Sequence, residues 1–454
     1  MRRRGGGTPD GGARHTRLAS PRRAHGPLGL LVAALASVAL ALSGCTATGA
    51  TSGPRFVTPP LIRFSSVLWP VPLELVGAAP GSRVRIEARL RTSRGSWHSA
   101  ATYTVPATGV VDLASATPQL AAFRRPDSAG LFWSLRGPQL PPAQLARQWM
   151  RDTNAVTLTA SDGDRLVAER TFELQGLAAE QSPHTVYTRD LLAGSFEGLL
   201  PRETHEEQPV GRFWDASSLE RPVSPAVLMF DDPSTGASSA FTAPLLSAFG
   251  ASVFVLPLGS PDGVHVSSVI DSGTVESVLQ WLSTRQDVDG RHIFVYGTGP
   301  AEPLALWAAA RFPDRLHGVF AGGGAASPLC SPPGARSPID EGGVPVACVN
   351  EATARATSLA GMNGPVVLVC GGRDAVLESS CEAQRAVAAL RTPRAGDALL
   401  VQPDAAHAVT VPPGLPIALP DASGARGADA QATQEARVAF WNTVGHLLLR
   451  AALP

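Results

Sequence analysis

The chain has 454 residues, of which 44% are hydrophobic, and its formal net charge at pH 7 is zero. At roughly 150 residues per domain, this length predicts two or three folded units. The balanced charge argues against a nucleic-acid partner, because phosphate binding needs a clustered basic surface. All 38 basic residues are arginine, so neither a lysine Schiff base nor a Ser–Lys catalytic pair can form.

Residues 1–45 have the pattern of a bacterial lipoprotein signal peptide. Arginines precede the apolar run 28–42, which is shorter than the roughly 20 residues that span a bilayer. The run ends in Leu42-Ser43-Gly44-Cys45, which resembles a lipobox whose Cys45 thiol takes the lipid. An ordinary signal peptide with a chance cysteine and twin-arginine export remain open alternatives. We expect a protein exported to the cell envelope and lipid-anchored to the outer face of the bacterial cytoplasmic membrane.

Residues 46–58 are small and polar, which suits a flexible tether. Export would place the four remaining cysteines in an oxidising compartment, where three pairings of them are possible. Cys330 and Cys348 lie in one Pro/Gly-rich segment and are the expected disulfide. Cys370 ends an apolar strand, where we expect a cysteine that is simply buried.

Residues 59–178 show short runs of alternating polar and apolar residues between turn signals, such as Arg83–Leu90 and 155–159. This alternation predicts the antiparallel strands of an Ig-like β-sandwich. Residues 179–223 are polar and irregular, and we expect them to be a linker.

From residue 224 to 454, apolar strands alternate with helical stretches. The expected strands are 227–230, 252–256, 293–296, 316–320 and 366–369. The expected helices are 242–249, 274–284, 301–312 and 434–451. Near-continuous apolar strands separated by helices predict an α/β domain whose mostly parallel sheet is covered on both faces. The stretch 327–346 interrupts this order and is expected to form a surface excursion.

Residues 294–301 (FVYGTGPA) form the candidate elbow, in which a strand meets a helix at a tight turn with small flanking residues. In α/β-hydrolases such a turn carries the nucleophile. Gly297 and Ala301 take the two small positions, which leaves Gly299 in the nucleophile position without a side chain that can attack. Shifting the frame to Thr298 puts Tyr296 and Pro300 where the backbones crowd, so that alternative is less favoured.

Two polar residues follow later strands in the order of an α/β-hydrolase triad. Asp374 follows the strand 366–369 and a Gly-rich turn, and His407 lies in the loop after 400–402. Either residue alone is weak evidence, because a loop Asp often caps a helix and a loop His is often just exposed. In this order after these strands, the pair predicts a catalytic acid and base.

The chain resembles the acyl-CoA thioesterase / bile acid-CoA:amino acid N-acyltransferase family over roughly residues 58–452. In the N-terminal half, 95–101 (GSWHSAA), 109–113 (GVVDL) and 128–135 (SAGLFWSL) look like three sandwich motifs of the family. The family positions of the C-terminal half follow in the expected order: Trp281-Leu282, the elbow, 371–374, 405–407 and Trp441.

The resemblance implies a thioester substrate, a Cys or Ser nucleophile with Asp374 and His407 as partners, and acyl transfer to water or an amino acid. Gly299 departs from that pattern. So does the loop after the first C-terminal strand, where the family's oxyanion hole forms. The oxyanion-loop candidates are Asp231, Asp232, Ser234 and Pro300. Pro233 removes an amide donor, and an aspartate would repel developing negative charge.

The favoured hypothesis is a catalytically degenerate hydrolase that binds an acyl or other hydrophobic small molecule, or a protein partner of unknown identity. The alternative is an active thioester hydrolase or acyltransferase that uses Thr298, Ser234 or water activated by His407, with Asp374. A purely structural envelope protein is a third possibility. We expect no cofactor, no metal, no nucleic acid, and membrane association only through the lipid on Cys45.

Overall fold

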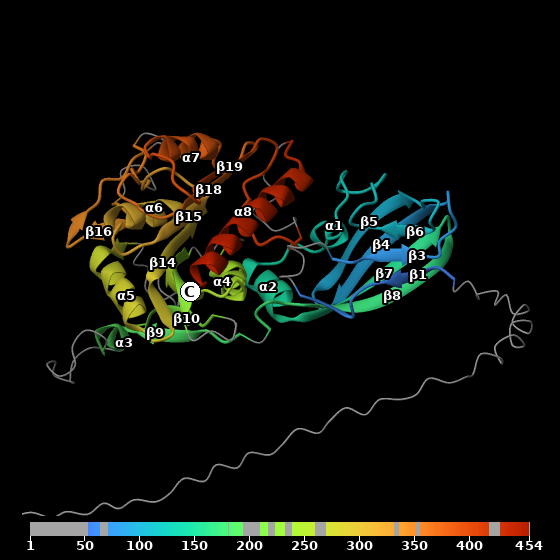
Figure 1. Cartoon of the computed structure of the whole chain (residues 1–454), viewed down its shortest axis with the longest axis horizontal. Coiled ribbons are helices and arrows are strands. Elements are labelled where there is room, and N and C mark those ends of the chain that lie inside the picture. The colour runs from blue at the N-terminus through green and yellow to red at the C-terminus, as the bar shows by residue number, and fades with distance from the viewer. Residues whose placement is uncertain are drawn as a thin grey trace, which may run out of the picture. The chain divides into compact units, whose positions relative to one another are not determined.

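The computed structural model (Figure 1) has all of its described residues in the unit Ser52–Pro454. It describes residues 53–63, 71–179, 181–193, 209–216, 223–231, 238–258, 269–330, 336–350, 355–416 and 427–453. The signal-peptide prediction, Cys45, Asp232 and Ser234 lie outside these ranges. Within them, no helix combines the length and the apolar character needed to cross a membrane.

Two β-sheets make up the N-terminal domain, as predicted. The larger has the order β2-β8-β7-β4-β5. Its strands are Leu61–Arg63 (β2), Arg165–Gln175 (β8), Thr153–Asp162 (β7), Arg83–Thr92 (β4) and Gly95–Thr104 (β5). The smaller sheet contains Arg55–Val57 (β1), Glu74–Val76 (β3) and Val110–Asp112 (β6). The strands alternate between buried and exposed residues, which is why the period-two pattern predicted them.

The sequence motifs of this domain meet in its core. Trp97 of β5 is 1% exposed and packs edge-on against Trp149. The Ser99 hydroxyl, two residues further on, donates to the Leu131 carbonyl at 2.5 Å. Leu131 belongs to α1 (Gly130–Trp133), the helical turn of the third motif. The first and third motifs therefore belong to one packed cluster, which links the edge strand β5 to α1.

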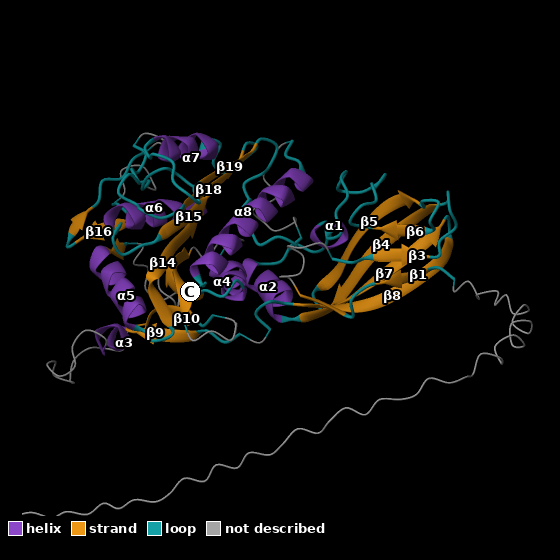
Figure 2. Cartoon of the chain, in the orientation of Figure 1, coloured by secondary structure: helices purple, strands orange, loops and turns teal. Residues whose placement is uncertain are grey.

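The C-terminal domain contains an eight-stranded sheet of order β19-β18-β15-β14-β11-β12-β10-β9. Its parallel strands are Ala398–Gln402 (β19), Val366–Gly371 (β18), Gly318–Gly322 (β15), Val288–Thr298 (β14), Ser224–Asp231 (β11) and Ser252–Pro257 (β12). Pro209–Trp214 (β10) and His184–Tyr187 (β9) complete it in antiparallel pairing. Figure 2 shows this sheet among its helices.

Helices cover both faces of this sheet, so its central strands carry near-continuous apolar runs. Alternate residues of β11 join different cores: Val227 packs with α4 (Ser239–Ala248) and α8 (Ala430–Ala451), and Leu228 packs with the helices of the other face. Those helices are α5 (Ser272–Thr284), α6 (Glu302–Arg311) and α7 (Ser380–Ala389). This arrangement is the predicted α/β-hydrolase fold.

Residues 179–223, which we expected to be a linker, supply β9, β10 and the short helix α3 (Thr188–Ala193). The two strands extend the main sheet beyond β12, so part of this segment belongs to the hydrolase domain. Phe213 of β10 is fully buried, and its ring meets Trp281 of α5 edge-on at 5.1 Å. Strands this short give little periodic signal, which is why the sequence pattern did not separate them from a linker.

The expected surface excursion contains a small sheet. Ile339–Glu341 (β16) pairs with Ile270–Asp271 (β13) and with Val344–Pro345 (β17). Cys330 forms a disulfide with Cys348 beside this sheet.

Candidate active site

The elbow has the backbone of a nucleophile turn. Strand β14 ends at Thr298, Gly299 follows with φ of +54°, and a 3₁₀ turn leads into α6. Gly297 lies where strand and helix cross, because a Cβ there would come within 2.4 Å of the Ala301 carbonyl oxygen. The sequence therefore needs a small residue at 297 for packing and tolerates the positive φ at 299 because glycine has no Cβ.

Gly299 faces the base of the predicted triad. A Cβ at this position would lie 3.9 Å from His407 Nε2, and no other atom of the described residues beyond the turn itself would lie within 4 Å of it. A serine or cysteine side chain would thus point at the imidazole with space around it. Glycine supplies no oxygen or sulfur, so the turn presents its backbone to His407 without a nucleophile.

Asp374 and His407 are brought together as predicted. Asp374 Oδ2 lies 2.8 Å from His407 Nδ1, with the Asp374 side chain fully buried and the His407 side chain 15% exposed. The other carboxylate oxygen, Oδ1, accepts hydrogen bonds from the amides of Val376 and Leu377, both at 2.9 Å. A carboxylate held in this way orients the imidazole so that its Nε2 is directed at the elbow.

A pocket of about 450 Å³ opens over the elbow. Gly299 and His407 both line it, and most of the remaining lining side chains are apolar: Leu258, Pro300, Pro303, Leu304, Leu329, Pro338, Val376 and Leu377. Arg336 also lines the pocket, and its guanidinium is paired with Asp340 at 2.6 Å. An apolar pocket of this size with few polar groups fits a small hydrophobic molecule.

The oxyanion-loop candidates do not form an anion site in the described part of the chain. In this fold one donor is the amide that follows the nucleophile, but Pro300 occupies that position and has no N–H. Asp231 is directed elsewhere: its carboxylate accepts from the amide and hydroxyl of Ser239 at 2.7 and 2.6 Å, where it caps α4. Its expected repulsive role at the elbow therefore has no geometric support.

Thr298 does not replace the missing nucleophile. It is 6% exposed and is not among the residues that line the pocket. On strand β14 it shares a face with Tyr296, whose ring stacks on Trp441 of α8 at 5.9 Å. The Thr298 hydroxyl thus belongs to the α8 side of the sheet.

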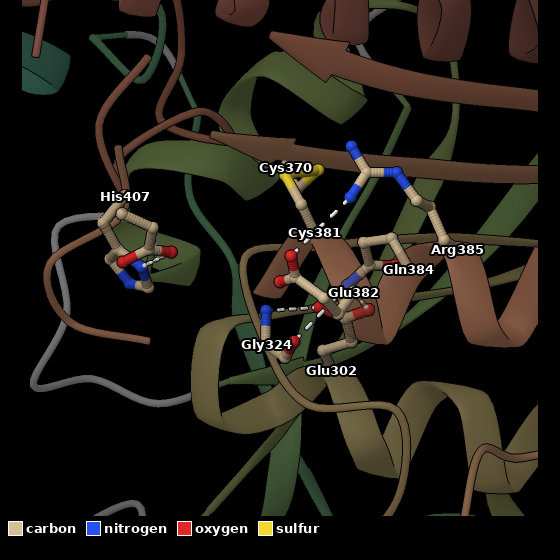
Figure 3. Close-up of a disulfide and its surroundings, with 9 residues drawn as sticks. Glu302, Gly324, Cys370, Cys381, Glu382, Gln384, Arg385 and His407 are labelled. Atoms are coloured by element: carbon tan, nitrogen blue, oxygen red, sulfur yellow. Dashed lines mark hydrogen bonds and ion pairs between the residues drawn. A yellow bond between two sulfur atoms is a disulfide. The ribbon is translucent and has the colours of Figure 1, made fainter. Parts of the chain in front are cut away.

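Sequence reasoning missed a buried polar cluster behind the elbow (Figure 3). Glu302 is fully buried and accepts hydrogen bonds from the Gly324 amide and from Gln384 Nε2, both at 2.5 Å. Burial raises the pKa of Glu302 from 4.5 to about 8, while its two hydrogen bonds oppose that shift. A glutamate at the start of an otherwise apolar helix was the available signal, but its partner is 82 residues away.

The second disulfide also differs from expectation. Cys370 of β18 is buried, as expected of a strand residue, but it is bonded to Cys381 of α7. This bond closes the segment that carries Asp374. Within the described residues, no group of three His, Cys, Asp or Glu side chains is placed to hold a metal ion.

Residues 69–179 match the family model described as the acyl-CoA thioester hydrolase/BAAT N-terminal region. The match is confined to this part of the chain. The match covers the BAAT-type sandwich, in which Trp97, Ser99 and Trp133 lie. It agrees with the resemblance found in the sequence, and the hydrolase fold follows this region in the chain. No curated protein matches the sequence.

Among solved structures, the dienelactone hydrolase from Klebsiella pneumoniae has 16% identity and a TM-score of 0.34, covering 52% of this chain and 93% of that one. The esterase LipW from Mycobacterium marinum has 14% identity and a TM-score of 0.36, covering 61% and 85%. Est1E from Butyrivibrio proteoclasticus has 12% identity and a TM-score of 0.34, covering 54% and 96%.

Proposed function

We propose that this member of a hydrolase-like family is an exported lipoprotein that binds an acyl or other hydrophobic small molecule beside His407 and does not turn it over. The observation that carries the proposal is Gly299. It stands at the elbow with a nucleophile-type φ of +54° and faces His407 Nε2, yet it has no side chain. Nucleophilic acyl transfer needs an oxygen or sulfur at that point.

Pro300 supports the same conclusion independently. Stabilising a tetrahedral intermediate requires amide donors aimed at the developing oxyanion, and loss of one donor costs about 10²- to 10³-fold in rate. Position 300 supplies none. The apolar pocket remains. Binding without turnover requires only the apolar pocket, which this site retains.

One observation favours a second candidate, a hydrolase in which His407 activates water. The Asp374–His407 pair keeps a hydrogen bond of 2.8 Å, as a general base requires. Because Pro300 has no N–H, such an enzyme would have to stabilise its oxyanion with donors other than the amide of residue 300.

Hydrolysis of p-nitrophenyl butyrate and of acyl-CoA by the mature protein distinguishes the two candidates. We expect wild type and His407→Ala to be indistinguishable from buffer. Substantial turnover by wild type that His407→Ala abolishes would establish the second candidate and overturn the first.

Binding is tested with a fluorescent fatty-acyl probe. We expect saturable binding that Leu329→Arg, which puts a charge in the pocket lining, weakens at least tenfold. Leu120→Arg is the matched control, because Leu120 is 68% exposed and is not among the pocket-lining residues. Equal binding by both variants would place the ligand elsewhere.

The lipobox and the two disulfides support the exported, lipid-anchored part of the proposal. We expect Cys45→Ala to move the protein from the membrane fraction to the soluble fraction, and mass spectrometry of the wild type to find lipid on the N-terminal Cys45. An unlipidated N-terminus in the membrane fraction would contradict this part alone.

A further inference from the structure

His407 Nε2 is a polar group that the pocket offers its ligand beside the elbow. Asp374 Oδ1 accepts two amides and Oδ2 faces His407 Nδ1. An ionised carboxylate can only accept hydrogen bonds, so Asp374 Oδ2 accepts from His407 Nδ1. Nδ1 therefore carries the proton. In the neutral imidazole, Nε2 is then a hydrogen-bond acceptor.

No described residue donates to this acceptor in the structure. Position 299 could do so, because a Cβ there would lie 3.9 Å from Nε2 and a serine hydroxyl would be closer still. Glycine leaves this space to the pocket, which Gly299 and His407 line together. We call this space, bounded by Gly299 and His407 Nε2, the elbow seat.

The elbow seat does not suit an anion. Pro300 has no amide to donate, and Arg336, the one cation among the lining residues, pairs with Asp340 through one guanidinium nitrogen. At the elbow seat, a carboxylate or phosphate would face the lone pair on Nε2 of the neutral imidazole instead of a donor. A hydroxyl requires only an acceptor, and Nε2 supplies it.

Resting on the proposed binding function, we propose that the ligand is an apolar alcohol whose hydroxyl occupies the elbow seat and donates to His407 Nε2. The hydroxyl takes the place that a nucleophile side chain takes in an active hydrolase. Its apolar part lies along Leu258, Leu304 and Leu329.

The test compares three probes of similar apolar length on the mature protein: 1-decanol, decyl methyl ether and sodium decanoate, each displacing the fluorescent probe. Wild type should bind 1-decanol about five- to tenfold more tightly than the ether, as one net hydrogen bond predicts. Decanoate should bind no better than the ether.

Two variants change the acceptor, and a third occupies the seat. His407→Leu removes Nε2, and Asp374→Asn offers Nδ1 a donor in place of an acceptor, which turns Nε2 into N–H. Both should bring the alcohol-to-ether ratio close to one while ether binding persists. Gly299→Ser fills the elbow seat with a hydroxyl of its own and should also abolish the alcohol preference. A loss of preference in Asp374→Asn separates this role from packing, because the two side chains have nearly the same size.

Equal binding of alcohol and ether by wild type, or tighter binding of decanoate, would overturn the alcohol proposal and leave the binding function standing. Failure of all three probes and of the fluorescent probe to bind would overturn the binding function itself.

Discussion

Asp374 and His407 keep every contact that a general base needs, whereas the elbow opposite them keeps its backbone and has no reactive group. On the base side, a buried carboxylate holds the imidazole at 2.8 Å and two amides hold the carboxylate. On the elbow side, Gly299 and Pro300 lack the nucleophile and an amide donor. Fold and packing therefore preserve the geometry of a hydrolase site independently of the atoms that do its chemistry.

The largest effect is expected when the nucleophile and the amide donor are returned to the elbow. We expect Gly299→Ser to give weak esterase activity, and Gly299→Ser with Pro300→Ala to exceed it by about 10²- to 10³-fold, because the second change restores an amide beside the oxyanion. Initial rates on p-nitrophenyl butyrate measure both. Pro300→Ala alone is the matched control and should stay inactive. A double variant no faster than Gly299→Ser would show that the missing amide is not the second defect.

The next largest effect is expected at Glu302, on the elbow side, in the pH dependence of the free energy of unfolding. Its pKa is raised from 4.5 to about 8 by burial, so the native state binds one more proton than the unfolded chain between those values. This contribution to the free energy of unfolding is complete below pH 4.5. It is lost as pH rises toward 8, by about 1.4 kcal/mol per pH unit.

Glu302→Gln keeps two hydrogen-bonding groups toward Gly324 and Gln384 and removes the titration. Urea unfolding at pH 5, 6.5 and 8 should give a smaller decline with pH for this variant than for wild type. Glu382→Gln serves as the control, since that side chain is 63% exposed. A decline identical in wild type and Glu302→Gln would contradict the buried, protonated state.

A smaller effect is expected from Gly299→Ala. A Cβ meets no close atom there, but φ of +54° strains any residue other than glycine. The free energy of unfolding should fall by about 1 kcal/mol. Gly53→Ala, where a Cβ also meets open space, is the control in the same urea experiment. If both changes have the same effect, the positive φ carries no cost.

The smallest effect is predicted for Thr298→Val. Thr298 shares a strand face with Tyr296 and does not line the pocket. Placed in the Gly299→Ser, Pro300→Ala background, it should change the esterase rate less than about twofold, since its hydroxyl takes no part in the reaction. A large loss of esterase activity would show that the Thr298 hydroxyl takes part in the reaction.

Much of the fold could be predicted because it depends on local pattern. Alternation marked the sandwich strands, and continuous apolar runs marked the buried strands, whose two faces both meet helices. The order of elbow, Asp374 and His407 was readable because each follows its own strand. The absence of a nucleophile could be predicted because glycine occupies position 299 of the elbow.

The rest depends on contacts between residues far apart in the chain. Gln384 donates to Glu302 across 82 positions, and neither residue type predicts the other as its partner. Cysteine spacing allowed three pairings, so the bond from Cys370 to Cys381 could not be chosen by counting. Strands β9 and β10 are short, and the pairing of β10 with β12 and with β9 was not encoded in a long periodic run.

The bond between Cys370 and Cys381 makes the peptide between them a closed ring. Arg373 lies within this ring with a side chain 59% exposed, and it follows the buried strand directly. A protease that cut after Arg373 would leave no free fragment, because the two new ends stay joined through sulfur. Asp374 would become a new N-terminus, joined through the chain to α7 and through the disulfide to β18. The loop that orients His407 can thus be nicked without being detached.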